Sequence, residues 1–153
     1  MAASQTNTLD DVASPAAPPR PAFPFIAVDE LGHASLTAQR CGTCGTIYAE
    51  SERMACARCG ARADAFSTVE PSYNGTLHSA SIVRRAYPGI PVPFISAIVD
   101  LDGGPTLKGI LRGTGLEPAD VAQGLRVKVV FDDALGRKDK EGNSYVSHFF
   151  EPA

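Results

Sequence analysis

The sequence has no tryptophan, and aromatic residues make up only 7% of its 153 positions. It also has no excess of basic residues, because 14 Lys and Arg stand against 17 Asp and Glu and give a net charge of −3. Proteins that bind nucleic acids usually combine a basic surface with stacking aromatics, so both shortages weigh against that class. No apolar run approaches the roughly 20 residues that a membrane-spanning helix needs.

The N-terminal end lacks the features of a targeting segment. Residues 1–11 contain neither the basic region nor the apolar core of a secretory signal. Arg20 is the only basic residue among the first 30, beside four acidic ones, which argues against a mitochondrial presequence. We therefore expect a cytoplasmic protein, where thiols stay reduced and paired cysteines serve as metal ligands rather than as disulfides.

What the sequence does have is four cysteines, all in one short stretch. Cys41 and Cys44 lie in C-G-T-C-G, and Cys56 and Cys59 lie in C-A-R-C-G. Two C-x-x-C pairs at this distance can place four thiolate sulfurs at the corners of a tetrahedron, the geometry of structural Zn²⁺. The glycine after each pair allows the positive φ that such a sharp turn needs. The pattern predicts a zinc ribbon with these four cysteines as ligands.

Two alternatives to zinc remain open at these cysteines. Four thiolates also suit iron in a rubredoxin-type site, although the pair Cys56-Ala-Arg-Cys59 lacks the proline common in rubredoxins. Disulfides are the other alternative. A catalytic zinc is disfavoured, since four protein ligands leave no open position for water. The metal would stabilise the fold, because a ribbon this short has too small a core to fold alone.

Composition divides the chain into three parts. Residues 1–22 are rich in Ala, Pro, Ser and Thr, which predicts a flexible tail that is either dispensable or a docking arm for a partner. Residues 23–64 are predicted to form a hairpin, with its turn at 30–33, followed by the zinc ribbon. Residues 65–153 carry the remaining strand signals and are predicted to form a second domain.

Five segments of the third part have the composition or period-2 pattern of β-strands. The turn Asp102–Pro105 joins the second and third of them and predicts a hairpin. A short helical turn is expected at 117–122, between the third and the fourth. Five strands in about 80 residues with one such excursion predict an all-β fold with a closed OB-type barrel, and a small open sandwich is the alternative. The five segments are 75–83, 94–101, 106–113, 126–131 and 144–150.

No residue of the sequence is predicted to be catalytic. If the ribbon takes all four cysteines, no thiol remains to act as a nucleophile in acyl transfer. His78 lies beside serines in the first barrel strand, but no nucleophile motif accompanies it, so a surface or interface role is expected. The alternation of Phe149 and Phe150 predicts one ring inside the barrel and one outside, where it can meet a partner.

The order of these motifs resembles the DUF35 family. The motifs that carry the resemblance are the two cysteine pairs, then Gly75-Thr-Leu-His-Ser, Pro93-Phe-Ile-Ser-Ala-Ile-Val-Asp-Leu-Asp-Gly-Gly and Gly124-Leu-Arg-Val-Lys-Val. The resemblance spans roughly residues 36–150. Members are described as a rubredoxin-like zinc ribbon joined to an OB-fold, and are typically small partners of thiolase-like proteins. Many members carry a longer helical entry before the first cysteine, whereas this sequence has a proline-rich tail and a predicted hairpin.

The resemblance implies a non-catalytic accessory subunit of a thiolase-like acyl-CoA complex, in which the partner performs Claisen or retro-Claisen C–C chemistry. This chain would stabilise the partner and help to form the CoA channel, with a coenzyme A thioester bound at the interface. Arg84 and Arg85 are candidate ligands of the CoA phosphates, since arginine matches phosphate geometry; a solvated outer face is the alternative. The apolar, proline-rich loop 87–94 that follows them is either a docking surface or a loop packed on its own barrel.

Two other functions remain as alternatives: a ribbon and OB protein that binds single-stranded nucleic acid, and a rubredoxin-like electron carrier.

Overall fold

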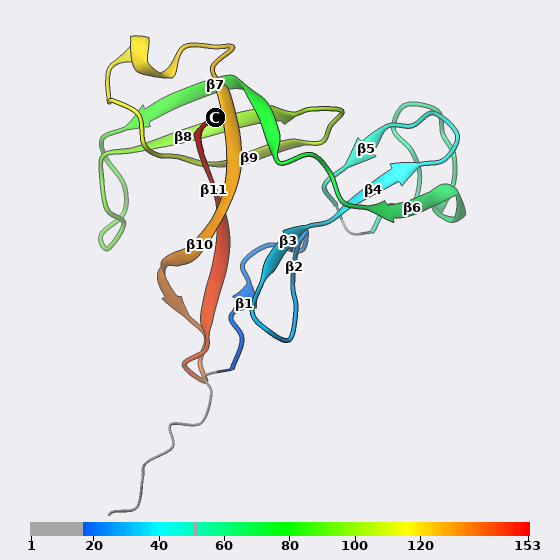
Figure 1. Cartoon of the computed structure of the whole chain (residues 1–153), viewed down its shortest axis with the longest axis horizontal. Coiled ribbons are helices and arrows are strands. Elements are labelled where there is room, and N and C mark those ends of the chain that lie inside the picture. Colours follow the sequence, from blue (N-terminus) through cyan, green and yellow to red (C-terminus); the bar gives the residue numbers. More distant parts are fainter. Residues whose placement is uncertain (1–16, 51) are drawn as a thin grey trace, which may run out of the picture.

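The computed structural model of the protein describes residues 17–50 and 52–153 (Figure 1). Most of the predicted tail, residues 1–16, lies outside them. The described chain is all-β, with two short 3₁₀ helices, η1 (Ala63–Ala65) and η2 (Pro118–Val121). Its strands are β1 (Arg20–Pro21), β2 (Ile26–Val28), β3 (Ala34–Leu36), β4 (Ala38–Cys41), β5 (Ile47–Tyr48), β6 (Phe66–Val69), β7 (Asn74–Val83), β8 (Phe94–Leu101), β9 (Thr106–Leu111), β10 (Arg126–Lys138) and β11 (Ser144–Pro152).

Five of these strands form a closed barrel. Their order is β7-β8-β9-β11-β10. The barrel is closed by the pairing of β10 with β7, in which Arg126 lies opposite Thr76. All neighbours are antiparallel except β9 and β11, which run parallel with Ile110 opposite Phe149. η2 lies between the third and fourth strands of the barrel. This is the order and the excursion of an OB-fold, so the predicted fold class is confirmed.

The barrel encloses the hydrophobic core, which alternate positions along each strand supply. Leu77, Val99, Val127 and Phe150 are fully buried, at 0% exposure. The predicted hairpin between β8 and β9 is present, and its turn is closed by the Gly104 amide, which donates to the Leu101 carbonyl over 2.7 Å. Residues that face inward therefore come from every strand, as the period-2 pattern requires.

The smaller sheets lie before the barrel in the chain and beside it in space (Figure 1). β2 and β3 form a hairpin around a turn in which Asp29 accepts hydrogen bonds from the amides of Leu31 and His33. β5, β4 and β6 form a three-stranded sheet that carries the first cysteine pair. By its pairing with β4, β6 belongs to this ribbon sheet, although it begins after residue 64.

Three features were not visible in the sequence pattern. β1 pairs in parallel with the start of β11, so Arg20 and Pro21, within the predicted tail, lie against the barrel. β10 continues to Lys138, beyond the predicted strand segment 126–131, because β11 provides a partner and a change of register after Asp133 absorbs the mismatch. Phe150 belongs to the barrel core and Phe149 does not, but Phe149 is also buried, because the Arg112 guanidinium covers its ring at 4.4 Å; the expected exposure of this ring was wrong.

His148 of β11 is buried against the N-terminal segment. It is 2% exposed, and its Nε2 lies 2.9 Å from the Lys108 carbonyl, to which it donates. The rings of Phe23 and Phe25 stack on one another and meet the imidazole edge-on at 5.3 and 5.1 Å. The Nδ1 atom is buried and has no hydrogen-bond partner among the described residues. The imidazole therefore anchors residues 23–25 to the barrel as a neutral ring.

We expect the stability of the protein to fall as the pH drops below about 6.5 because of His148. Desolvation lowers the pKa of this imidazole from 6.5, and the bond to the Lys108 carbonyl offsets this only in part. Between the two pKa values, the unfolded chain binds a proton at this imidazole and the folded chain does not. The contribution of His148 to the free energy of unfolding is therefore fully present above the unfolded-state pKa and is lost as the pH falls toward the folded-state pKa. An NMR titration of the imidazoles checks this: His148 should titrate below 6.5, and a higher value would contradict it.

Candidate metal centre

Two sharp turns present the four cysteines. Cys41 ends β4, and its carbonyl accepts a hydrogen bond from the Gly45 amide at 2.8 Å. The second pair repeats this turn, with the Gly60 amide donating to the Cys56 carbonyl at 2.9 Å. Gly45 and Gly60 have φ of 76° and 77°, in the left-handed region that a side chain disfavours. The sequence therefore folds twice into the same knuckle, each with two thiols on its inner side.

The knuckles bring all four sulfurs together. The Sγ atoms of Cys41, Cys44, Cys56 and Cys59 lie within 4.8 Å of one another. Across the two knuckles, Cys41 and Cys59 are 3.7 Å apart and Cys44 and Cys56 are 3.5 Å apart. A tetrahedron with Zn–S bonds of about 2.3 Å has edges of about 3.8 Å, so these separations fit a four-thiolate metal site. The cluster could hold a metal ion such as zinc.

Hydrogen bonds from outside the cluster polarise two of the thiols. The Tyr48 hydroxyl lies 3.3 Å from Cys56 Sγ and lowers the pKa of Cys56 to about 6. The Thr46 hydroxyl lies 3.2 Å from Cys44 Sγ and lowers the pKa of that thiol. For Cys59 the Ala61 amide acts in the same direction, but burial and the neighbouring sulfurs outweigh it and raise the pKa to about 12. A cation that binds here displaces the remaining protons, so metal affinity should rise with pH.

Arg84 and Arg85 lie at the other end of the barrel strands, directly after β7. Both side chains are exposed. Arg84 donates through Nη2 to the Leu116 carbonyl at 3.2 Å, which ties the loop after β7 to the segment before η2. The loop that continues from them carries Tyr87, 84% exposed, with Ile90 and Val92 also exposed. The two arginines thus lie at the start of a loop that exposes apolar side chains.

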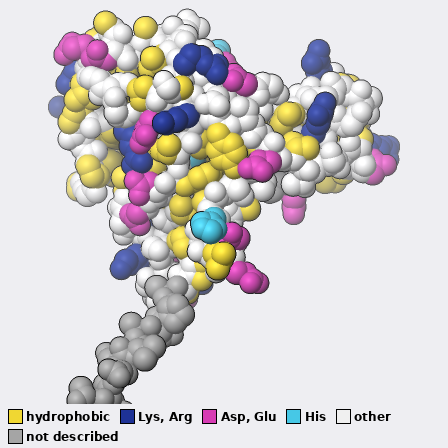
Figure 2. All heavy atoms as spheres, viewed as in Figure 1, with side chains coloured by type: hydrophobic (Ala, Val, Ile, Leu, Met, Phe, Trp, Pro, Cys, Tyr) yellow, Lys and Arg dark blue, Asp and Glu magenta, His cyan; other side chains and the backbone are white. Residues whose placement is uncertain are grey.

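Two other arginines of the barrel, Arg112 and Arg126, are paired with carboxylates. Arg126 donates to both carboxylate oxygens of Asp102, at 2.8 and 2.7 Å. Arg112 bonds to Asp132 at 2.8 Å and to Glu151 at 3.1 Å. Acidic and basic side chains are interspersed on the face shown in Figure 2. The pairing leaves these two arginines poorly suited to binding a nucleic-acid backbone.

His78 forms a polar cluster on the outside of the barrel. Its Nδ1 lies 2.9 Å from an Asp100 carboxylate oxygen, and the Thr106 hydroxyl donates to the other at 2.6 Å. The His78 and Asp100 side chains are about half exposed, at 58% and 49%. Among the described residues the free cysteines are the four of the ribbon, so no thiol lies near this imidazole.

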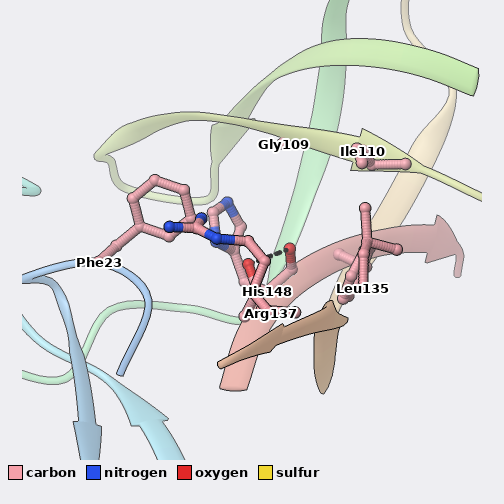
Figure 3. A pocket seen from close by; sticks show the side chains of 9 residues that line it. Phe23, Gly109, Ile110, Leu135, Arg137 and His148 are labelled. Atoms are coloured by element: carbon pink, nitrogen blue, oxygen red, sulfur yellow. Dashed lines mark hydrogen bonds between the residues drawn. The ribbon is translucent and has the colours of Figure 1, made fainter. Parts of the chain in front are cut away.

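An apolar cavity opens where the N-terminal segment meets the barrel (Figure 3). It has a volume of about 170 Å³. Phe23 and His148 line one side of it, and Leu135 of β10 extends toward Ile110 of β9 across it. Two larger cavities, of about 400 and 550 Å³, also border Phe23. Sequence reasoning did not find this region, because it depends on residues far apart in the chain.

No helix in residues 17–50 and 52–153 has the length and apolar character needed to cross a membrane.

Comparison with known proteins finds a family model and solved structures that are similar to this chain. Residues 68–132 match the family model described as ChsH2, C-terminal OB-fold domain. The solved structure "Ltp2-ChsH2(DUF35) aldolase" contains a chain similar to this one, with 26% sequence identity and a TM-score of 0.58. The alignment covers 77% of this chain and 84% of that one, so it extends beyond the segment that the family model matches. No curated protein matches the chain.

Proposed function

Because the chain belongs to the DUF35 family, we propose that it is the non-catalytic accessory subunit of a thiolase-like acyl-CoA complex. In this complex the partner makes or breaks C–C bonds by Claisen or retro-Claisen chemistry. The observation that carries the proposal is the similarity to the DUF35 chain of an aldolase that also contains Ltp2. The position of the cysteines also supports a non-catalytic role. All four lie in the ribbon, so no thiol remains for acyl transfer.

The metal in this proposal is zinc, held by Cys41, Cys44, Cys56 and Cys59. When bound, it supplies no chemistry to the substrate and stabilises the ribbon. The donor set supports zinc, because four soft thiolates at tetrahedral spacing are its usual structural ligands. Iron in the same site would give the rubredoxin-like alternative, which the colour of the purified protein distinguishes.

The rest of the surface serves the partner and the substrate. The exposed apolar side chains of the loop 87–94 contact the partner, and Arg84 and Arg85 at its base meet the phosphates of the CoA thioester. Apolar side chains on a proline-rich loop lose little conformational freedom on binding, which favours docking. We place the complex in the cytoplasm, where the thiols stay reduced before the metal binds.

Co-purification from the native host tests the proposal. A thiolase-fold subunit should elute with the chain, and acyl-CoA should undergo C–C bond formation or cleavage only when both subunits are present. Turnover of a thioester by the isolated chain would contradict the proposal, as would a partner of another fold.

Replacing Arg84 and Arg85 together with alanine should raise the KM of the complex for acyl-CoA several-fold without a matching loss of kcat. Each arginine that bonds a phosphate contributes a charge-assisted hydrogen bond, which solvent weakens at these exposed positions. The matched control replaces Lys138 and Lys140, an equally exposed basic pair at the far end of β10, and should leave KM unchanged. An unchanged KM in the arginine variant would remove the CoA role of these residues.

A further inference from the structure

Tyr48 connects the two knuckles of the metal centre. It lies on β5, which pairs with β4, the strand that ends in Cys41 of the first pair. Its hydroxyl reaches the second pair, 3.3 Å from Cys56 Sγ. The Thr46 hydroxyl also meets a sulfur, but that sulfur belongs to Cys44, two residues away in the same knuckle. Of these two contacts, only that of Tyr48 reaches a sulfur of the second knuckle.

The ring of Tyr48 is held from two sides. The guanidinium of Arg53 lies over it at 3.7 Å from the ring centre, and Phe66 of β6 meets it edge-on at 6.1 Å. Arg53 is itself held by Glu50, 3.0 Å away, and its side chain is only 19% exposed. A partly buried cation over a phenol ring draws electron density from it, which makes the hydroxyl a better donor.

The charge of the site explains why such a donor matters. Four thiolates around a divalent cation leave a net charge of −2 on the centre, much of it on the sulfurs. A hydrogen bond to one sulfur and a nearby cation both offset this charge. Loss of a metal from thiolates begins with protonation or oxidation of a sulfur, and a hydrogen-bonded sulfur is less open to both.

We propose that Tyr48, oriented by Arg53, is a positioning residue of the metal centre that donates its hydroxyl to the Cys56 thiolate and retains the bound ion. The inference rests on the metal-binding part of the proposed function but is independent of any partner or substrate. Tyr48 acts through Cys56 and is not itself a ligand.

The variant Tyr48→Phe tests this, because it keeps the ring and the Arg53 contact and removes only the hydroxyl. Chelator competition should give a zinc affinity about tenfold lower than in the wild type, the lower end of the range for residues that support metal ligands. In the cobalt-substituted protein, the sulfur-to-cobalt charge-transfer bands should move to lower energy, since the Cys56 sulfur regains electron density. A loss of packing alone would not shift these bands in a folded ribbon.

The matched control is Tyr145→Phe in the barrel, where a tyrosine also lies beside an arginine, with Arg137 at 5.6 Å, but far from the cysteines in the fold. It should change neither quantity. Arg53→Met should shift both in the same direction as Tyr48→Phe, by a smaller amount. Equal zinc affinities and equal cobalt spectra for Tyr48→Phe and the wild type would overturn the role of the hydroxyl alone. A wild-type protein that binds neither metal would overturn it together with the zinc site.

Discussion

Replacing Cys56 with alanine is expected to unfold the ribbon and leave the barrel intact. Few side chains are fully buried around the cysteines, with Ala38, Cys41 and Cys56 the main ones, so the ribbon has little core of its own. In zinc-finger peptides the metal supplies about 10–16 kcal/mol of apparent binding energy, most of which serves folding. The barrel core is a separate cluster that includes Leu77, Val99 and Phe150. Loss of one thiolate should therefore act locally.

Amide spectra measured by NMR check this prediction. Amides of residues 41–62 should collapse toward unfolded shifts in Cys56→Ala, and those of β7 and β8 should keep their positions. Met54→Ala is the control, because that side chain lies in the same loop and is 87% exposed. Ribbon amides that stay in place in Cys56→Ala would show that the ribbon needs no metal.

Replacing Phe150 with alanine should have the largest effect on the barrel. The ring is fully buried and belongs to the central core. It packs directly against Gly109 of β9, so closely that a Cβ added to this glycine would lie 2.8 Å from the ring. β11 brings it between β9 and β10, so no neighbouring strand can move in to fill the space. Removing a buried Phe side chain costs roughly 3–5 kcal/mol, against a total stability of about 5–15 kcal/mol for a domain.

Urea denaturation monitored by circular dichroism measures the loss of stability in Phe150→Ala, which should appear as a lower urea concentration at the midpoint of unfolding. Tyr87→Ala is the matched control, since it removes a ring that is 84% exposed and should change stability by less than about 0.5 kcal/mol. A Phe150→Ala variant as stable as the control would contradict the description of the core.

Much of the fold could be predicted from the sequence because its signals are local. The β-rich composition of 94–101 and the turn Asp102–Pro105 predict the β8–β9 hairpin, and the two knuckles follow from cysteine spacing and glycine. The excursion at 117–122 appears as η2. These patterns depend on residues within one strand or one turn, which a single sequence displays directly.

What could not be predicted depends on contacts between distant residues. β1 is too short and proline-rich to be recognised as a strand and exists only because β11 offers it a free edge. The burial of Phe149 requires Arg112, which directly follows β9. In the metal centre, the cysteines were visible in the sequence, whereas no motif of the sequence marks Tyr48 as part of the site. Its contact with Cys56 arises from the pairing of β5 with β4, which no local pattern records.

Native mass spectrometry of freshly purified protein tests the central claim most directly, that the four cysteines hold a structural zinc and leave no thiol for catalysis. The account predicts a mass equal to the chain with about one zinc ion and no disulfide. A metal-free chain with four reactive thiols, or one with disulfides in place of the ion, would contradict it.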